Sequence, residues 1–256
     1  MFDSHCHLDR IADDPEAALR RAKSAGVTDL VIAGVNPSGW EEQLAWVQPG
    51  VTIAVGLPPW AVSDEADQTL ADLSALEEFI QNNAASIRGI GETGLDFGAH
   101  CSAATHDNQR TALRTHLQLA VEWNLPLVLH VVNAHGAVID ILRQSNLPAA
   151  GGMVHSFSGS AEIAREYIRL GLCVSFSGAI TNPERKRLRQ ALASVPDHAL
   201  LVETDAPDQT PWNRRPSPNE PAFLIDVIAA AAEIRNQSPE DVARLTATNA
   251  RKLFHR

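Results

Sequence analysis

Histidines and carboxylates recur at the ends of apolar segments along this chain, in a pattern that suits metal-dependent hydrolysis. Near the N-terminus, the run DSHCHL carries His5 and His7 two residues apart. A β-strand there would place both imidazoles, with Asp3, on one face and Phe2, Cys6 and Leu8 on the other. Two neutral imidazole nitrogens spaced in this way can bind one metal ion. The pair alone is weak evidence, because an HxH run arises easily by chance in a chain with ten histidines.

A second segment, GIGETGLDF, combines an apolar run with an isolated carboxylate. Two-residue alternation places Arg88, Ile90 and Glu92 on one face of a strand. Glu92 would then stand at the carboxyl end, where a barrel enzyme keeps its catalytic groups. The structural alternative is a salt bridge to Arg88 or to another cation.

Three more segments end in the same manner. PLVLH ends at His130, GGMVH ends at His155, and LLVETDAP carries Glu203 and Asp205 on one face with Leu201. A single histidine at a strand end is commonly structural. Five strand ends that each carry a histidine or a carboxylate favour one shared site.

The segments that carry these residues alternate with helical patterns along the whole chain. Strands are predicted over residues 2–7, 30–34, 51–56, 87–92, 127–130, 152–155, 172–176 and 200–204. Helices are predicted over residues 16–25, 40–47, 70–82, 110–123, 134–143, 161–170, 183–193, 221–234 and 239–254. This order predicts a single-domain (β/α)8 TIM barrel of the α/β class over residues 1–256, with its active site at the carboxyl ends of the strands. The alternative is a doubly wound open sheet.

Composition excludes several classes of protein. The net charge is −10, which argues against a protein that coats DNA but allows an enzyme that grips phosphates through bound metal. Cys6, Cys101 and Cys173 are too few and too scattered for a disulfide framework, so we expect a cytoplasmic location. Neither a secretion signal nor a membrane span is predicted, and no obligate protein partner is evident.

The blocks DSHCHLD, GETGLDF, HSFSG, ETDAP and TNARKLF, in this order, resemble the signature of the TatD-like metal-dependent hydrolases of the amidohydrolase-like superfamily. The resemblance spans the whole chain. It implies two divalent metal ions per chain, of Zn, Mn or Mg. The implied ligands are His5, His7 and Asp205 for one ion, His130 and His155 for the other, and Glu92 bridging both.

The resemblance also implies a reaction. A hydroxide held between the two ions would attack a phosphodiester, and Asp205 would take its proton. Glu203 would lie beside the metal ligands or on the substrate side, so that Asp205, Glu92 and Glu203 form the predicted catalytic set. The expected activity is that of a TatD-like exonuclease on DNA or on a small phosphodiester. An amide or lactone hydrolase on the same barrel and a metal-binding barrel without turnover are the alternatives.

The chain departs from the family pattern in two places. The family usually has a GxHPH-like run where Gly56 begins the sequence GLPPW, and it often has Ser-Arg after His130, where this chain has Val131, Val132 and Asn133. Both departures remove polar groups expected near the substrate, but neither touches an implied metal ligand. The predicted substrate contacts are Trp60, which could stack on a base or cap the barrel mouth, and Arg214 and Arg215, which could bind phosphate.

Other polar residues are expected to be structural or solvated. His100, Cys101 and His106 lie in the segment after GLDF, which we interpret as a solvated loop rather than a substrate-facing lid. Cys6 is expected to be buried away from the metal site. The basic run at Arg185, Lys186, Arg187 and Arg189 is interpreted as a solvated helix face. No role is predicted for His116, His135, His198 and His255.

Overall fold

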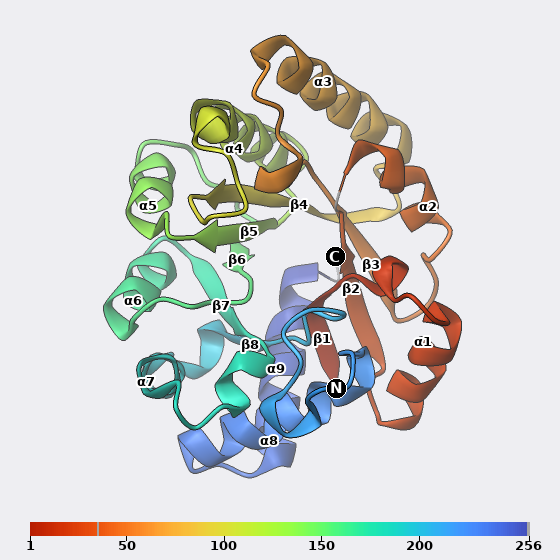
Figure 1. The fold of residues 1–256 in the computed structure, drawn as a ribbon, viewed down its shortest axis with the longest axis vertical. Coiled ribbons are helices and arrows are strands. Elements are labelled where there is room, and N and C mark those ends of the chain that lie inside the picture. Colours follow the sequence, from red (N-terminus) through yellow and green to blue (C-terminus); the bar gives the residue numbers. More distant parts are fainter. Residues whose placement is uncertain (35, 255–256) are drawn as a thin grey trace.

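The computed structural model describes residues 1–34 and 36–254, which form the predicted single-domain (β/α)8 barrel (Figure 1). His255 lies outside the described residues. One eight-stranded sheet runs in the order β1 to β8, and each pair of consecutive strands is parallel. The strands span Phe2–Cys6 (β1), Asp29–Ala33 (β2), Val51–Val55 (β3), Ile87–Asp96 (β4), Leu127–Val132 (β5), Gly152–Val154 (β6), Leu172–Phe176 (β7) and Leu200–Val202 (β8).

Helices follow the strands and surround the sheet, as Figure 1 shows. They span Pro15–Ser24 (α1), Trp40–Leu44 (α2), Ala66–Asn83 (α3), His106–Glu122 (α4), His135–Arg143 (α5), Ala161–Arg169 (α6), Lys186–Ser194 (α7), Leu224–Arg235 (α8) and Pro239–Phe254 (α9). Local sequence explains the start of α1, where the Asp14 carboxylate accepts the Ala17 N–H at 2.8 Å and Pro15 occupies the first turn.

The barrel closes where β8 returns beside β1. The Asp205 N–H donates to the carbonyl of His5 at 3.0 Å, and the His7 N–H donates to the carbonyl of Ala206 at 2.7 Å. These bonds join the carboxyl ends of the first and last strands. The predicted metal ligands from the two ends of the sequence are thereby brought together, as a barrel requires and an open sheet would not.

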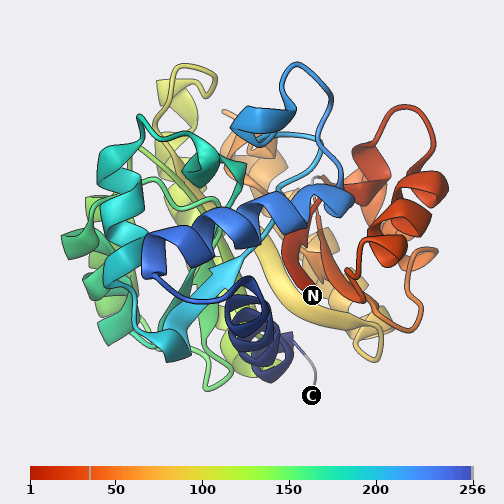
Figure 2. The same cartoon turned by 90° about the horizontal axis from the view of Figure 1, so that it is seen from below.

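Two layers of apolar side chains hold this frame. One joins the outer faces of the strands to the surrounding helices and includes Leu30, Ile32 and Leu113. The other takes one buried residue from each of several strands and packs them on α9 around Phe254. Figure 2 shows α9 beneath the barrel, at the end away from the long loop between β8 and α8. The lower end is therefore filled with apolar side chains, and the upper end is free to hold polar ones.

Strict two-residue alternation is wrong in two strands. Phe2 packs in the inner layer, whereas Cys6 and Leu8 pack in the outer one, because the pairing of β1 with β2 shifts register between Asp3 and Cys6. In β4, Ile90 packs in the outer layer. The register of β4 on β5 shifts just after Ile90, which separates its face from that of Glu92. Such irregularities add a residue to one strand and re-aim the side chains beyond it.

Among the described residues, no helix is long and apolar enough to cross a membrane.

Candidate metal centre

The centre of the site is Glu92, at the point where β4 reaches the carboxyl end of the barrel. Its Oε1 lies 3.1 Å from Nε2 of His5 and 3.0 Å from Nε2 of His7. The two Nε2 atoms are 3.4 Å apart and face the same carboxylate oxygen. All three side chains are buried. The HxH pair and Glu92, predicted separately from sequence, thus form one cluster.

The other oxygen of Glu92 faces a second pair of histidines. Its Oε2 lies 3.3 Å from Nδ1 of His130 and 3.1 Å from Nε2 of His155. Those two ring nitrogens are 3.0 Å apart. The carboxylate therefore stands between two pairs of imidazoles and offers one oxygen to each.

Asp205 lies beside the first pair. Its Oδ1 is 3.6 Å from Nε2 of His5, 3.7 Å from Nε2 of His7 and 3.9 Å from Nδ1 of His155. The backbone of Asp205 has a φ of +56°, a left-handed conformation that aspartate tolerates better than most residues. All six predicted ligands are thus brought within reach of one another from the carboxyl ends of five different strands.

The donor set fits divalent cations. Both carboxylate oxygens of Glu92 are buried and have no hydrogen-bond partner. Leaving a buried polar atom unpaired costs roughly 1–3 kcal/mol, which a bound cation facing these atoms would offset. Imidazole and carboxylate donors suit Zn²⁺ or Mn²⁺ and permit Mg²⁺.

Electrostatics favour positive charge in this cluster. Burial opposes ionisation of Glu92, but His155 and His5 lower the pKa of its carboxyl well below the usual range. Burial also opposes the charged form of His155, yet Glu92 and Glu203 raise the pKa of this imidazole well above its ordinary value. Burial raises the pKa of Asp205, against the pull of the same histidines. The buried carboxylates therefore draw in positive charge, which protons or a metal ion can supply.

Two further carboxylates lie behind the histidines. Oε1 of Glu203 accepts the backbone N–H of Ser156 at 2.5 Å and lies 3.6 Å from Nδ1 of His155. Oδ2 of Asp96 lies 3.3 Å from Nε2 of His130. Asp96 is absent from the sequence-based site. Its signal was available, because Asp96 is four residues beyond Glu92 in the same motif and therefore on the same face of a regular strand.

The cluster lies at the base of a hollow of about 570 Å³ at the barrel mouth. Trp60 stands at its wall, with its ring edge-on to His130, centroids 4.8 Å apart and planes at 77°. Arg215 also lines the hollow and lies over the ring of Trp212 at 5.3 Å. Arg214 is turned elsewhere: its Nε donates to Asp226 at 2.9 Å and its guanidinium covers Phe223, so the structure favours Arg215 of the two as a substrate contact.

The segment after GLDF is only partly a solvated loop. His100 is exposed as expected, but it also lines the hollow above the cluster. His106 begins α4 and packs against Phe97, with centroids 4.0 Å apart. Cys101 is half-buried. The interpretation of this segment as a solvated loop is therefore incomplete, because His100 faces the site.

The residues for which the sequence predicts no role in the site have structural contacts. Cys6 is buried in the outer apolar layer, away from the ligand cluster, as predicted. Nε2 of His116 accepts the Leu57 N–H at 2.9 Å, and Nδ1 of His135 lies 3.0 Å from the Tyr167 hydroxyl. In the basic run, Arg189 is half-buried and pairs with Glu233 at 2.6 Å. The other three basic residues of that run are exposed, as a solvated face requires.

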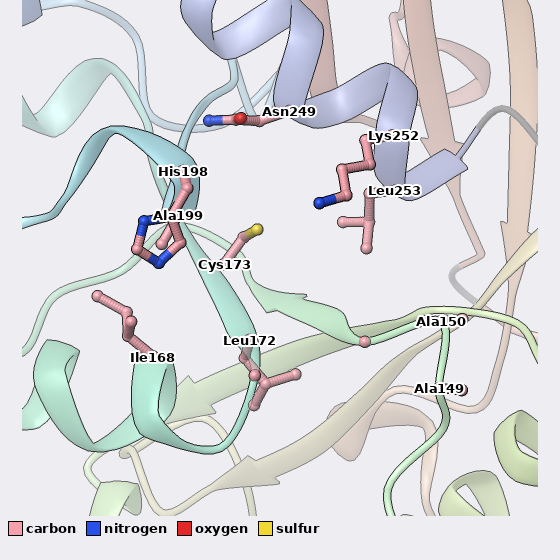
Figure 3. A pocket seen from close by; sticks show the side chains of 12 residues that line it. Ala149, Ala150, Ile168, Leu172, Cys173, His198, Ala199, Asn249, Lys252 and Leu253 are labelled. Carbon is pink, nitrogen blue, oxygen red and sulfur yellow. The ribbon is translucent and has the colours of Figure 1, made fainter.

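A separate hollow of about 290 Å³ lies at the amino ends of β6 and β7, against α9 (Figure 3). Figure 3 shows Lys252 and Asn249 extending from α9 on one side, with Cys173 and His198 on the other. None of the predicted ligands lines this hollow. Barrel enzymes keep their chemistry at the carboxyl ends of the strands, so the cluster around Glu92 is the candidate functional site.

Comparisons with known proteins agree with this fold. Residues 2–255 match the family model described as TatD related DNase. The chain is 32% identical to the "Uncharacterized metal-dependent hydrolase YabD" of Bacillus subtilis, over 99% of this chain and 98% of that protein. It is 34% identical to the "3'-5' ssDNA/RNA exonuclease TatD" of Pantoea vagans, over 99% of each chain. The solved structure of YJJV, a TatD homologue from Escherichia coli, matches with a TM-score of 0.92 and 30% identity, over 100% of this chain and 98% of that one.

Proposed function

This chain belongs to the TatD related DNase family, and we propose that it is a metal-dependent hydrolase that cleaves phosphodiester bonds in DNA or small nucleotides. The observation that carries the proposal is the position of Glu92, with one oxygen facing each of two histidine pairs. A shared carboxylate of this kind suits a centre of two divalent ions. The relatives that are named exonucleases support a nucleic acid substrate.

We assign the ligands by their place in the cluster. His5, His7 and Asp205 would hold one ion, His130 and His155 would hold the other, and Glu92 would contact both. Divalent ions bound there would polarise a phosphoryl oxygen and lower the pKa of water near it. Zn²⁺, Mn²⁺ and Mg²⁺ all remain compatible with these donors.

Asp205 is proposed to handle the proton. Its Oδ1 would accept the proton of the attacking water and later return it to the leaving oxygen, because a general base must lie within reach of the reacting atoms. Asp205 lines the hollow that substrate must enter and stands beside both histidines of the first pair. Glu203 and Asp96 are proposed as positioning residues, although Asp96, unlike Glu203, also lines the hollow. They hold the rings of His155 and His130 in place through the contacts described above.

Substrate contacts are proposed for the two walls of the hollow. Trp60 offers an exposed ring, and Arg215 offers a guanidinium that can pair with a phosphate. Trp60 and Arg215 would supply part of the substrate contacts expected of the polar residues that the sequence GLPPW lacks. Arg214 remains a weaker candidate, because Asp226 already pairs with its side chain.

A carbonyl substrate is the second candidate. Trp60 and Val132 give the hollow an apolar wall where the family usually has polar groups. An apolar wall suits an amide or lactone substrate as well as a phosphodiester. A metal-binding barrel without turnover is the third alternative. It is disfavoured because so many buried ionisable groups converge on one point that is open to substrate.

The test is release of nucleotides from end-labelled single-stranded DNA, with Mg²⁺, Mn²⁺ or Zn²⁺ added separately and a chelator as control. We expect metal-dependent cleavage that is lost in His5→Ala. His198→Ala is the matched control, because His198 lies in the hollow at the other end of the barrel. Hydrolysis of model lactones or amides, without cleavage of DNA or of model phosphodiesters, would contradict the proposal and favour the carbonyl substrate.

The cytoplasmic location and the absence of an obligate protein partner stay predictions from the sequence.

A further inference from the structure

A second hollow adjoins the metal centre. It has a volume of about 300 Å³ and lies between the loops that follow β3 and β4. Trp60 and His100 line both this hollow and the one above the metal centre. These two side chains therefore form the boundary across which the two hollows meet. None of the proposed metal ligands lines the second hollow.

Trp60 is held rigidly at this boundary. It lies in the short 3-10 turn Pro59–Ala61, and the adjacent prolines restrict the backbone before it. The Leu57 N–H donates to His116, and Nε2 of Gln109 donates to the carbonyl of Pro59 at 3.4 Å. The ring is nevertheless 42% exposed. An exposed aromatic ring on a fixed support can bind a planar ligand with little further loss of side-chain entropy.

The second hollow also offers polar groups beside Pro59 and Val62. Oγ of Ser63 accepts the Glu65 N–H at 3.0 Å, and Oγ of Ser102 accepts the Ala104 N–H at 3.3 Å, which leaves each hydroxyl hydrogen able to donate. The carboxylate of Asp64 and the imidazole of His100 are exposed in the same hollow. Donors and acceptors beside an aromatic ring are the groups by which proteins bind an unstacked nucleobase.

We propose that the second hollow is a subsite for the nucleobase of a nucleotide whose phosphate lies at the metal centre. This inference rests on the proposed function. A base can offer its hydrogen-bonding edge to this hollow only when it is not paired, so the subsite selects an unpaired nucleotide. The base lies against Trp60, and its hydrogen-bonding edge faces the serine and histidine side chains.

Equilibrium binding tests the subsite without turnover. The Mn²⁺-loaded protein is titrated calorimetrically with AMP, with ribose 5-phosphate and with inorganic phosphate. Stacking of one base on an aromatic side chain changes affinity by about five- to 150-fold. We therefore expect AMP to bind at least about fivefold more tightly than ribose 5-phosphate.

Variants of Trp60 distinguish stacking of the base on the ring from simple filling of space by an apolar side chain. Trp60→Leu keeps an apolar side chain but removes the ring, and we expect it to bind AMP no better than ribose 5-phosphate. Trp60→Phe keeps a ring and is expected to recover most of the preference. Binding of ribose 5-phosphate itself is expected to stay the same in all three proteins, because its phosphate and sugar do not need the ring.

The results would distinguish a wrong base subsite from a wrong proposed function. Equal affinities for AMP and ribose 5-phosphate in the wild type, with DNA still cleaved, would overturn the base subsite and leave the phosphodiesterase intact. An equal loss for all three compounds in Trp60→Leu would show that Trp60 only shapes the metal centre, which also overturns the subsite. If no phosphate compound binds and no phosphodiester is cleaved, both proposals fall.

Discussion

The carboxylate of Asp96 lies 3.3 Å from Nε2 of His130, while Nδ1 of the same ring lies 3.3 Å from Glu92. Asp96 is itself fixed, because its Oδ1 accepts the Gly98 N–H at 2.7 Å. His130 is therefore held from both sides, with Nδ1 directed into the ligand cluster. A carboxylate behind a metal-binding imidazole fixes the orientation of the ring and raises its basicity.

Removal of Asp96 is expected to weaken metal binding more than folding. Loss of such a partner typically lowers metal affinity by about 10- to 100-fold, and we expect this in Asp96→Ala, with partial recovery in Asp96→Asn. The measurement is a Mn²⁺ titration, with circular dichroism to check the fold. Asp107→Ala removes an exposed carboxylate on α4 and is the control. Equal Mn²⁺ affinity in Asp96→Ala and the wild type would show that Asp96 does not support the metal ligand.

Loss of Glu92 is expected to remove metal and activity together. Its two oxygens face both histidine pairs, so Glu92→Ala disturbs both halves of the proposed centre. We expect fewer bound ions per chain by elemental analysis and a fall in turnover of at least about 100-fold, since loss of an outer partner alone costs up to that much. Glu77→Ala, on the exposed face of α3, is the control. Turnover in Glu92→Ala comparable to the wild type would contradict the binuclear mechanism.

The order of elements was predictable from sequence because most strands are short apolar runs and most helices have an amphipathic period. β4 is the instructive exception. It was predicted to end at Glu92, but it continues to Asp96 and pairs Asp96 with Val132 of β5. Glycines are rare within strands, so the sequence GETG resembles a strand end. In the structure Gly94 instead allows close approach to the backbone of His130.

The site was predictable where each ligand closes an apolar run, as His130 and His155 do. Contacts that depend on local irregularity were not. The register shift after Ile90 re-aims Glu92, and the turn before Trp60 carries that ring to the edge of His130. Neither the register shift nor the turn can be recognised from the spacing of apolar residues in the sequence. Asp96 was missed for another reason: the strand was predicted to end at Glu92, so the even spacing of Glu92 and Asp96 in one motif was not used.

His116 links α4 to the loop that carries Trp60, and it makes stability depend on pH. Burial lowers the pKa of its imidazole from the usual 6.5 to about 4. Between these values the unfolded chain binds a proton that the native protein excludes. The free energy of unfolding is therefore unaffected by protonation of His116 above about pH 6.5, and it decreases as the pH falls from 6.5 toward 4. The loss is about 1.4 kcal/mol per pH unit, or roughly 3 kcal/mol in all.

The variant His116→Leu, which removes both ring nitrogens and keeps a buried side chain of similar size, tests this dependence. At pH 8 it is expected to be less stable than the wild type by about 1–3 kcal/mol, because the Leu57 N–H loses its buried acceptor. The difference should narrow as the pH falls from 6.5 to 4, since only the wild type pays for keeping this imidazole neutral. Urea unfolding with a chelator present measures both proteins without metal. A difference that stays constant across this range would contradict a lowered pKa at His116.

Gly94 is expected to be indispensable to the metal centre although it has no side chain. Its φ is +139°, and a Cβ placed there would meet the carbonyl oxygen of His130 at 2.0 Å. Gly94→Ala must therefore separate β4 from β5 beside His130, because the contact is with backbone and cannot be relieved by a side-chain rotation. Gly136→Ala is the matched control, since a Cβ in that α5 position meets nothing within 4 Å. We expect Gly94→Ala to lose at least about 2 kcal/mol of stability and to bind metal more weakly, while Gly136→Ala is neutral or slightly stabilising. Thermal unfolding and Mn²⁺ titration of both variants measure this, and a Gly94→Ala protein with normal stability and metal affinity would show that the two strands can separate there without disturbing His130.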